Sequence, residues 1–392
     1  MQQNIKKNIP RLYLIKIAKW FMLFMPIVVL FYQENGLEMK EIFFLQTIYS
    51  IAIVILEIPS GYLADVLGRK HTMIIGTIMG FFGFVCYSFS YGFWGFAIAE
   101  IILGIGQSLI SGADSAMLYD SLLVMGKADK YMKYEGRIIS VGNFAEAIAG
   151  IFGGLLATIS LRTPYYAQTF VALIGIPAAI LLIEPERHGK LVNAKFKDII
   201  GIVKYSLIEN IKLRWNIIFS SVIGASTLVM AWFVQPYFKL IDLPLSMYGI
   251  LWTFLNLVVG FAAMYAHMLE EIMKPRKIFI FIAILIPLGY IIVSQIDTYS
   301  GIVILFGFYI VRGVATPVLK DYINRLTDSN IRATVLSVRN FVIRIFFAII
   351  GPFIGWYIDK YTLSEALLVS GLTFLFLAII TLILQLRVLN KN

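Results

Sequence analysis

The amino-acid sequence predicts an all-α integral membrane protein whose twelve transmembrane helices form two six-helix bundles. Three observations predict this class. First, 59% of the 392 residues are hydrophobic, 14% are charged and the mean hydropathy is +0.83, so the chain has too little polar surface to cover a soluble globule. Second, apolar runs of roughly 20 residues, the length that crosses a bilayer, recur along the chain. Third, Lys and Arg gather in alternate loops between these runs.

The candidate crossings follow from the apolar runs and the turn residues between them. The first six lie near residues 11–33, 41–65, 72–91, 93–122, 137–160 and 164–184. Six more lie near residues 214–239, 246–268, 277–296, 300–324, 332–358 and 362–387. At about 20 apolar residues per crossing, these spans and their loops account for almost the whole chain, so no soluble catalytic or nucleic-acid-binding domain is left over.

The longest stretch without a crossing, residues 185–213, divides the chain into an N-terminal bundle, 1–184, and a C-terminal bundle, 214–392. We expect this linker on the cytoplasmic side. Within it, Ile200 and Val203 belong to an apolar series at helical spacing, opposite several lysines. Such a pattern is typical of an amphipathic helix that lies on the inner leaflet. A solvated linker is the alternative.

The distribution of basic residues gives the expected orientation. With the N-terminus inside, most loop Lys and Arg residues fall in the cytoplasm, and the outer loops keep Lys40, Arg162, Lys239 and Lys360. Positive residues favour the cytoplasmic side of membrane proteins. The net charge of +10 therefore reflects membrane topology, and nucleic acid is not an expected partner.

The turn between the second and third crossings carries the most specific motif. Its sequence fits G-x-L-x-D-x-x-G-R-K and closely resembles the cytoplasmic loop between helices two and three of major facilitator superfamily transporters. Gly68 permits the positive φ of a tight turn, and the natural partners of Asp65 are Arg69, four residues on, or the positive end of another helix. The string R-A-T-V-L-S, which begins at Arg332, resembles the start of helix eleven in bacterial drug-exporter-like members, and its register puts a positive helix end beside the Asp65 turn. The expected conformational latch comprises Gly61, Asp65, Gly68, Arg69, Lys70 and Arg332.

Two further strings bear on the branch of the superfamily. A-G-I-F-G-G, residues 149–154, is similar to the G-P-x-x-G-G signature of helix five in exporters, with Gly150 in place of the proline. In helix four, Glu100 stands before Gly104, where many members place an arginine, so the proton-relay role of that arginine is not carried over. The resemblance implies the major facilitator fold, alternating access to a central site, and a place near the drug:proton antiporter branch.

Acidic residues inside the membrane are the candidates for proton coupling, because each ionised group costs about 2.5–3.5 kcal/mol at the bilayer centre and needs a reason to be there. Glu146, near the middle of the fifth crossing, is the first choice. Glu100 and Asp114 are fourteen residues apart and are expected on nearly one face of the fourth helix, as a ladder of carboxylates. Asp120 is expected to pair with a lysine of the following loop. Structural roles remain the alternative for Asp114 and Glu146.

Basic and aromatic residues are the candidates for the substrate cavity. Arg312 and Arg344 lie roughly midway through the tenth and eleventh crossings. Since arginine stays charged, each needs an acid such as Asp114 or Glu146, an anionic substrate group, or backbone carbonyls at a broken helix. Helix one carries Lys19 in place of the mid-membrane carboxylate of many organic-cation exporters, which would fit an anionic or zwitterionic substrate. The expected cavity comprises Lys19, Tyr119, Trp232, Gln235, Asn256, Arg312 and Arg344.

Several classes of function are disfavoured. Cys86 is the single cysteine, and the three histidines lack metal-ligand spacing, so no metal site and no cofactor are expected. No phosphate-binding loop and no nucleophile–base constellation occurs in the sequence, which argues against an ATP-driven pump and against an enzyme.

The expected function is secondary active transport of small amphipathic molecules, by proton-coupled efflux. A proton-coupled uptake symporter for a nutrient or metabolite, and a lipid flippase, are the alternatives. The expected partners are the small-molecule substrate, protons and membrane lipids, and the chain is expected to act as a monomer. The Ile/Lys-rich composition and the lack of N-glycosylation sequons fit a multi-pass protein of a bacterial inner membrane.

Overall fold

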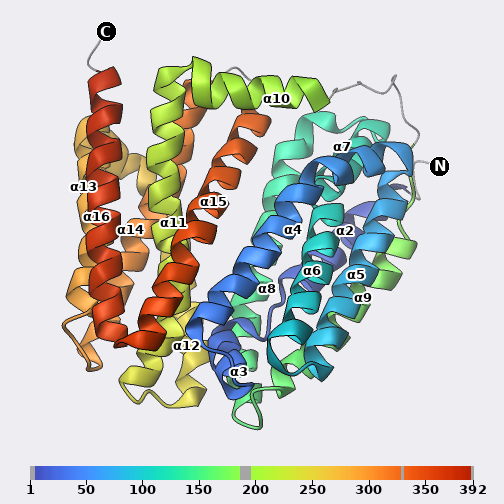
Figure 1. Ribbon diagram of the computed structural model, residues 1–392. Helices are drawn as coiled ribbons and strands as arrows, with labels where there is room; N and C mark the ends of the chain where they lie inside the picture. Colours follow the sequence, from blue (N-terminus) through green and yellow to red (C-terminus); the bar gives the residue numbers. More distant parts are fainter. Residues whose placement is uncertain (1–4, 186–195, 328–330, 390–392) are drawn as a thin grey trace. The chain divides into compact units, whose positions relative to one another are not determined.

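The computed structural model describes residues 5–185, 196–327 and 331–389, which form helices joined by short turns, with no strand among them (Figure 1). The helices before residue 186 are α2 (Asn8–Trp20), η1 (Met25–Ile27), α3 (Val28–Glu34), α4 (Met39–Val66), α5 (Arg69–Phe89), α6 (Gly92–Ile110), α7 (Ala113–Val124), η2 (Ala128–Lys130), α8 (Tyr131–Ala157) and α9 (Thr163–Ile180). The later ones are α10 (Phe196–Lys204), η3 (Tyr205–Glu209), α11 (Ile211–Leu240), α12 (Leu245–Met264), α13 (Ala266–Val293), α14 (Ser300–Arg325), α15 (Arg332–Lys360) and α16 (Leu363–Leu389).

The prediction of an all-α membrane protein is confirmed. Within the described residues, 11 helices are long and apolar enough to cross a membrane, and each coincides with a predicted crossing. The sixth predicted crossing is α9, which is 18 residues long and is not one of these 11. Its two prolines, two tyrosines and Gln168 lower its mean hydropathy. It nevertheless packs lengthwise against α5 and α2, as a member of the bundle does.

Two predicted crossings are broken helices. The first is interrupted between Trp20 and Met25, and the fourth between Ile110 and Ala113. Ser111, with an extended ψ of 130°, and Gly112, with φ of 81°, interrupt the fourth helix because a right-handed helix needs negative φ and negative ψ. Glu100 and Asp114 therefore lie on different helices, α6 and α7, and the expected ladder along one continuous helix face is wrong.

The second part of the predicted linker contains a helix, α10, followed by the π-helical turn η3. Ile202 and Val203 pack against a buried cluster that includes Leu213 and Val338, whereas Ile200 is 51% exposed. Residues 186–195 of the linker lie outside the described part of the chain.

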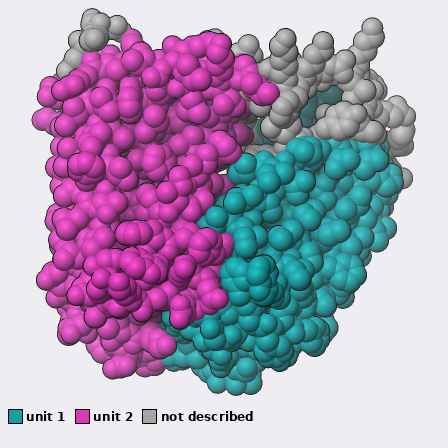
Figure 2. All heavy atoms as spheres, viewed as in Figure 1, with its two compact units in different colours: residues 1–37, 45–193, 245–253 teal, residues 38–44, 194–244, 254–392 magenta. Residues whose placement is uncertain are grey.

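The chain divides into two compact units, coloured separately in Figure 2. Unit 1 comprises Met1–Leu37, Leu45–Asn193 and Leu245–Thr253, and unit 2 comprises Glu38–Phe44, Ala194–Pro244 and Phe254–Asn392. Two helices thus run from one unit into the other: α4 begins in unit 2, and α12 begins in unit 1.

In unit 1, the beginning of α12 packs tightly on α8 through glycines. A Cβ atom at Gly249 would lie 2.1 Å from the carbonyl oxygen of Gly150 and 3.0 Å from the Cα of Gly154. The Thr253 hydroxyl donates to the carbonyl oxygen of Ala147 at 2.8 Å. Because backbone meets backbone here, only glycine fits at position 249 without a shift of one helix.

In unit 2, the beginning of α4 packs on α15 in a similar way. A Cβ atom at Gly355 would lie 2.7 Å from the Cα of Lys40. The Asp359 carboxylate accepts hydrogen bonds from the backbone N–H groups of Met39 and Lys40, each at 2.8 Å. These are unpaired donors of the first helical turn, so Asp359 caps α4 from another helix.

Candidate functional site

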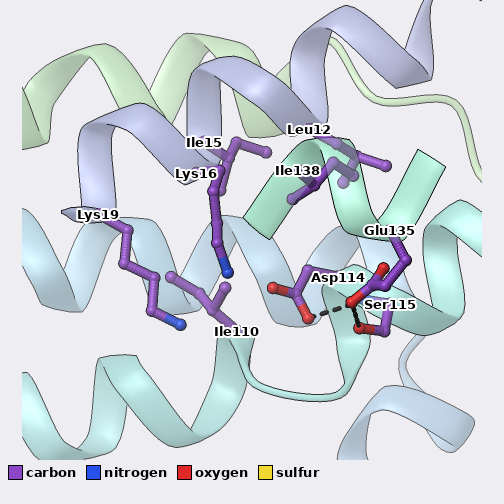
Figure 3. A pocket seen from close by; sticks show the side chains of 9 residues that line it. All are labelled: Leu12, Ile15, Lys16, Lys19, Ile110, Asp114, Ser115, Glu135 and Ile138. Carbon is purple, nitrogen blue, oxygen red and sulfur yellow. Dashed lines mark hydrogen bonds between the residues drawn. The ribbon is translucent and has the colours of Figure 1, made fainter. Parts of the chain in front are cut away.

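Unit 1 contains a hollow that carries four charged side chains (Figure 3). We call it the charged hollow. The empty space among its lining atoms is about 300 Å³ when the open solvent in front of them is counted. Its lining residues are Leu12, Ile15, Lys16, Lys19, Ile110, Asp114, Ser115, Glu135 and Ile138.

The local sequence explains how these side chains meet. Lys16 and Lys19 are three residues apart on α2, a spacing that puts them on one side of a helix. The interruption at Gly112 separates α6 from α7, so Asp114 stands in the first turn of α7, where the helix dipole favours a carboxylate. The backbone N–H of Ser115 donates to Asp114 Oδ1 at 2.8 Å, and its hydroxyl donates to Glu135 Oε1 at 2.9 Å.

The lysines and the acids of the hollow are near one another without being paired. None of these four described residues forms a salt bridge within 4.0 Å with another of them. Lys16 Nζ instead lies 5.3 Å from the centre of the Trp20 ring. The Asp114 charge attracts the Lys19 ammonium group, and the Lys16 charge repels it. Both signs of charge are therefore available to a ligand.

A second site in unit 1 is the side chain of Glu100, which is 5% exposed. Its Oε1 atom accepts hydrogen bonds from Gln46 Nε2 at 2.7 Å and from the Tyr32 hydroxyl at 3.0 Å. The Tyr32 hydroxyl also shares a hydrogen bond with the Tyr87 hydroxyl. No Lys, Arg or His among the described residues lies within 4.0 Å of this carboxylate. Glu100 is thus a buried acid that only neutral groups contact.

Arg162 caps the C-terminus of α5, near Glu100. Its guanidinium group donates to the carbonyl oxygens of Ser88 and Ser90 at 2.9 and 3.0 Å, and to Asn35 Oδ1 at 2.5 Å. It also lies 4.1 Å from the centre of the Tyr91 ring. The sequence identified Arg162 as a charge of an outer loop, and the structure adds its role as the cap of a helix C-terminus.

The motif turn before α5 is held by two acids from elsewhere in unit 1. Gly68 has φ of 99°, as predicted from the motif. The Glu184 carboxylate accepts from the backbone N–H groups of Arg69 and Lys70 at 3.0 and 2.7 Å. The Arg69 guanidinium forms a close ion pair with Asp120 of α7. The sequence named a lysine of the next loop as the expected partner of Asp120, and the structure adds Arg69 as a partner that it did not name.

Some predicted latch residues are not described. The surroundings of Gly61 and the side chains of Asp65 and Arg332 lie outside the described part of the structure, so the latch itself stays a prediction. Glu184 was not singled out from the sequence. Its only signal there is its position as the first acid after the apolar run of the sixth crossing.

The remaining predicted site residues are divided between the units. In unit 1, Glu146 is half-buried on α8, and Tyr119 is 45% exposed and packs edge-on against Tyr131. The other five belong to unit 2. They are Gln235, which is buried, and Trp232, Asn256, Arg312 and Arg344, which are half-buried.

Two arginines of unit 2 differ in their surroundings. The Arg312 guanidinium lies 5.2 Å from the centre of the Tyr309 ring on the same helix. Arg339 is only 4% exposed, and its Nε donates to the Ser220 hydroxyl at 2.5 Å. Within the described part of unit 2, no carboxylate lies within 4.0 Å of Arg339. The structure thus brings Lys19 and Asp114 together and leaves the pairing of Asp114 or Glu146 with Arg312 or Arg344 a prediction.

Apolar helices that cross the membrane around buried charges define a multi-pass membrane protein. The sequence profile of the Major Facilitator Superfamily matches residues 13–346, and the chain belongs to this superfamily. It is accordingly a transporter of the cell membrane.

Relatives and solved structures agree with this family. The uncharacterized MFS-type transporter MJ1560 of Methanocaldococcus jannaschii is 25% identical over 252 residues, which are 64% of this chain and 61% of that protein. The quinolone resistance protein NorA of Staphylococcus aureus is 21% identical over 221 residues, 56% of this chain and 53% of NorA. In both cases the match spans less than two thirds of the relative.

Two solved transporters share the fold at low identity. The nucleoside transporter NupG aligns with a TM-score of 0.81 at 15% identity, over 97% of this chain and 99% of that one. A D-xylose–proton symporter aligns with a TM-score of 0.75 at 13% identity, over 97% of each chain. At these identities the likeness concerns the fold alone.

Proposed function

We propose that this chain is a proton-coupled secondary active transporter that exports small amphipathic molecules by alternating access. The observation that carries the proposal is Glu100, a carboxylate buried in a crossing helix and contacted by neutral groups alone. Such a residue has no structural counter-ion to explain its presence in the membrane, where ionisable groups are costly and are usually functional.

The surroundings of Glu100 suit a group that gains and loses a proton. Burial disfavours the charged form, whereas the hydrogen bonds from Gln46 and Tyr32 favour it. The Tyr32 hydroxyl can also turn its hydrogen and accept from a protonated acid. The site can therefore hold either form, as a proton carrier must. Glu146 and Asp114 remain proposed partners of Glu100 in coupling.

The export direction is supported by the similarity to NorA, a quinolone resistance protein, and by the resemblance of the motifs to drug exporters. The second candidate is a proton-coupled uptake symporter, which the fold likeness to a D-xylose–proton symporter favours. Transport measured in right-side-out and inside-out vesicles under the same proton gradient distinguishes the two directions.

The test of coupling compares Glu100→Gln, Glu146→Gln and native protein in liposomes that contain a pH indicator. Glu271→Gln, which removes an exposed carboxylate, is the matched control. A panel of cationic, zwitterionic and anionic amphiphiles is added, and internal pH and substrate exchange are recorded. We expect Glu100→Gln to lose substrate-driven proton movement and to keep exchange of labelled substrate.

The outcomes separate the candidates. Proton movement that persists in Glu100→Gln removes Glu100 from the mechanism. Loss in Glu146→Gln alone assigns coupling to Glu146. Substrate movement by native protein without any proton movement overturns proton coupling as a whole.

A further inference from the structure

We infer that the charged hollow binds a small zwitterion that carries an ammonium group, a carboxylate group and an apolar part. The inference rests on the proposed function, because it names the class of substrate that the transporter carries. It is drawn from the charges, hydrogen bonds and lining of the hollow in unit 1.

The first argument is the balance of charge. Lys16 and Lys19 contribute two positive charges to the hollow, and Asp114 and Glu135 contribute two negative ones. Their sum is zero. A ligand with a net charge would add an uncompensated charge to a half-enclosed site, whereas a net-neutral ligand with two charged groups adds none.

The second argument is the separation of the two signs. Both lysines come from α2, and in Figure 3 they descend from that helix. Both acids accept a hydrogen bond from Ser115. The backbone N–H of Ser115 donates to Asp114, and the hydroxyl of Ser115 donates to Glu135. The hollow therefore has a cationic side and an anionic side. A ligand that bridges them must present its carboxylate to α2 and its ammonium group to the acids beside Ser115.

The third argument is that the lysines and the acids of the hollow do not form ion pairs with one another. No lysine of the hollow is within 4.0 Å of either acid, so ligand binding breaks no ion pair in the described structure. Asp114 attracts Lys19, and Lys16 repels it. A ligand carboxylate between the two lysines removes that repulsion.

The lining also limits the polarity of the ligand. Apart from Ser115, the uncharged lining is aliphatic: Leu12, Ile15, Ile110 and Ile138. An aliphatic amino acid is the simplest molecule that carries an ammonium group, a carboxylate group and an apolar part.

The experiment measures binding to the purified full chain without a proton gradient, by calorimetry. Three probes share one apolar group: L-leucine is the zwitterion, L-leucinamide the cation and N-acetyl-L-leucine the anion. We expect L-leucine to bind at least about tenfold more tightly than either of the others, the ratio that 1.4 kcal/mol gives.

Two variants test the two sides of the hollow. We expect Lys19→Gln to weaken L-leucine and N-acetyl-L-leucine by about tenfold or more and to spare L-leucinamide. Asp114→Asn should weaken L-leucine and L-leucinamide and spare N-acetyl-L-leucine. The matched controls are Lys7→Gln and Asp129→Asn, which remove exposed charges of unit 1 outside the hollow.

The result with native protein decides the inference even if a variant fails to fold. Equal affinities for the three probes, or no binding of any of them, overturn it, and so does an unchanged preference in folded Lys19→Gln. If L-leucine binds but moves no proton in liposomes, the proposed coupling fails while the inference stands. If another substrate moves protons and L-leucine does not bind, the inference alone fails.

Discussion

A methyl group at Gly249 tests the glycine contact between α8 and α12. In Gly249→Ala the new Cβ would lie 2.1 Å from the carbonyl oxygen of Gly150, whereas close carbon–oxygen contacts in proteins are about 3.3–3.6 Å. The helices must therefore separate by roughly 1 Å. Both opposing atoms belong to the backbone, so no side-chain rotation relieves the clash. Overpacking of this kind costs about 1–3 kcal/mol.

That cost applies to any conformation in which α8 and α12 touch. It lowers the population of such a conformation by about 5- to 150-fold relative to one in which the helices are apart. The control is Gly260→Ala on the same helix, where a Cβ would meet nothing within 4 Å. Alanine there improves helix propensity by about 0.8–1.0 kcal/mol.

The assay is thermal unfolding of purified protein, together with the transport rate in liposomes. We expect the unfolding midpoint to fall in Gly249→Ala and to stay or rise in Gly260→Ala, with transport slowed in the former alone. Equal midpoints and equal rates in the two variants would refute the reasoning, since they would mean that the α8–α12 contact affects neither the stability of the protein nor its transport rate.

Two further predictions concern acids of unit 2. The Tyr322 hydroxyl donates to the Glu270 carboxylate and holds its pKa below the ordinary value of 4.5. A carboxylate whose pKa is lower in the folded than in the unfolded protein stabilises the fold when the pH is above its unfolded pKa, and this stabilisation is lost as the pH falls through its folded pKa. Tyr322→Phe should therefore lower the unfolding midpoint at pH 7 and much less at about pH 3.5. Asp359→Asn weakens two charge-assisted bonds at the N-terminus of α4 and should cost about 0.5–2 kcal/mol. Its unfolding midpoint is compared with that of Asp297→Asn, which removes an exposed acid, and equal midpoints would contradict the capping role.

The class of fold could be predicted because membrane spans have a length and a polarity that a sequence displays directly. The interruptions of the first and fourth helices could not. Each is a few residues long and leaves the apolar run intact, so hydropathy does not register it. A local signal exists for one of them: Gly112 followed by Ala113 and Asp114 is the pattern of a helix end and a new helix start.

The candidate site was predicted in part. Lys19 and Asp114 were selected because ionisable residues inside the membrane are exceptional, and the structure places them in one hollow. Glu135 was missed because it precedes the fifth predicted crossing and looks like an ordinary loop charge. The partners of Glu100 were also beyond prediction: Tyr32 and Gln46 are 68 and 54 residues away, and helical periodicity says nothing about which distant side chains meet.

The passage of α4 and α12 from one unit into the other has a consequence for the biogenesis of the protein. Unit 1 lacks one of its packing surfaces until residues 245–253 have left the ribosome, well after all its other helices have been inserted. In unit 2 the order of synthesis is reversed: an early segment waits for a late one. Its segment Glu38–Phe44 is among the first parts of the chain to enter the membrane and meets α15, with Gly355 and Asp359, only near the end of synthesis. Neither unit can therefore finish folding before translation has passed well beyond the middle of the chain.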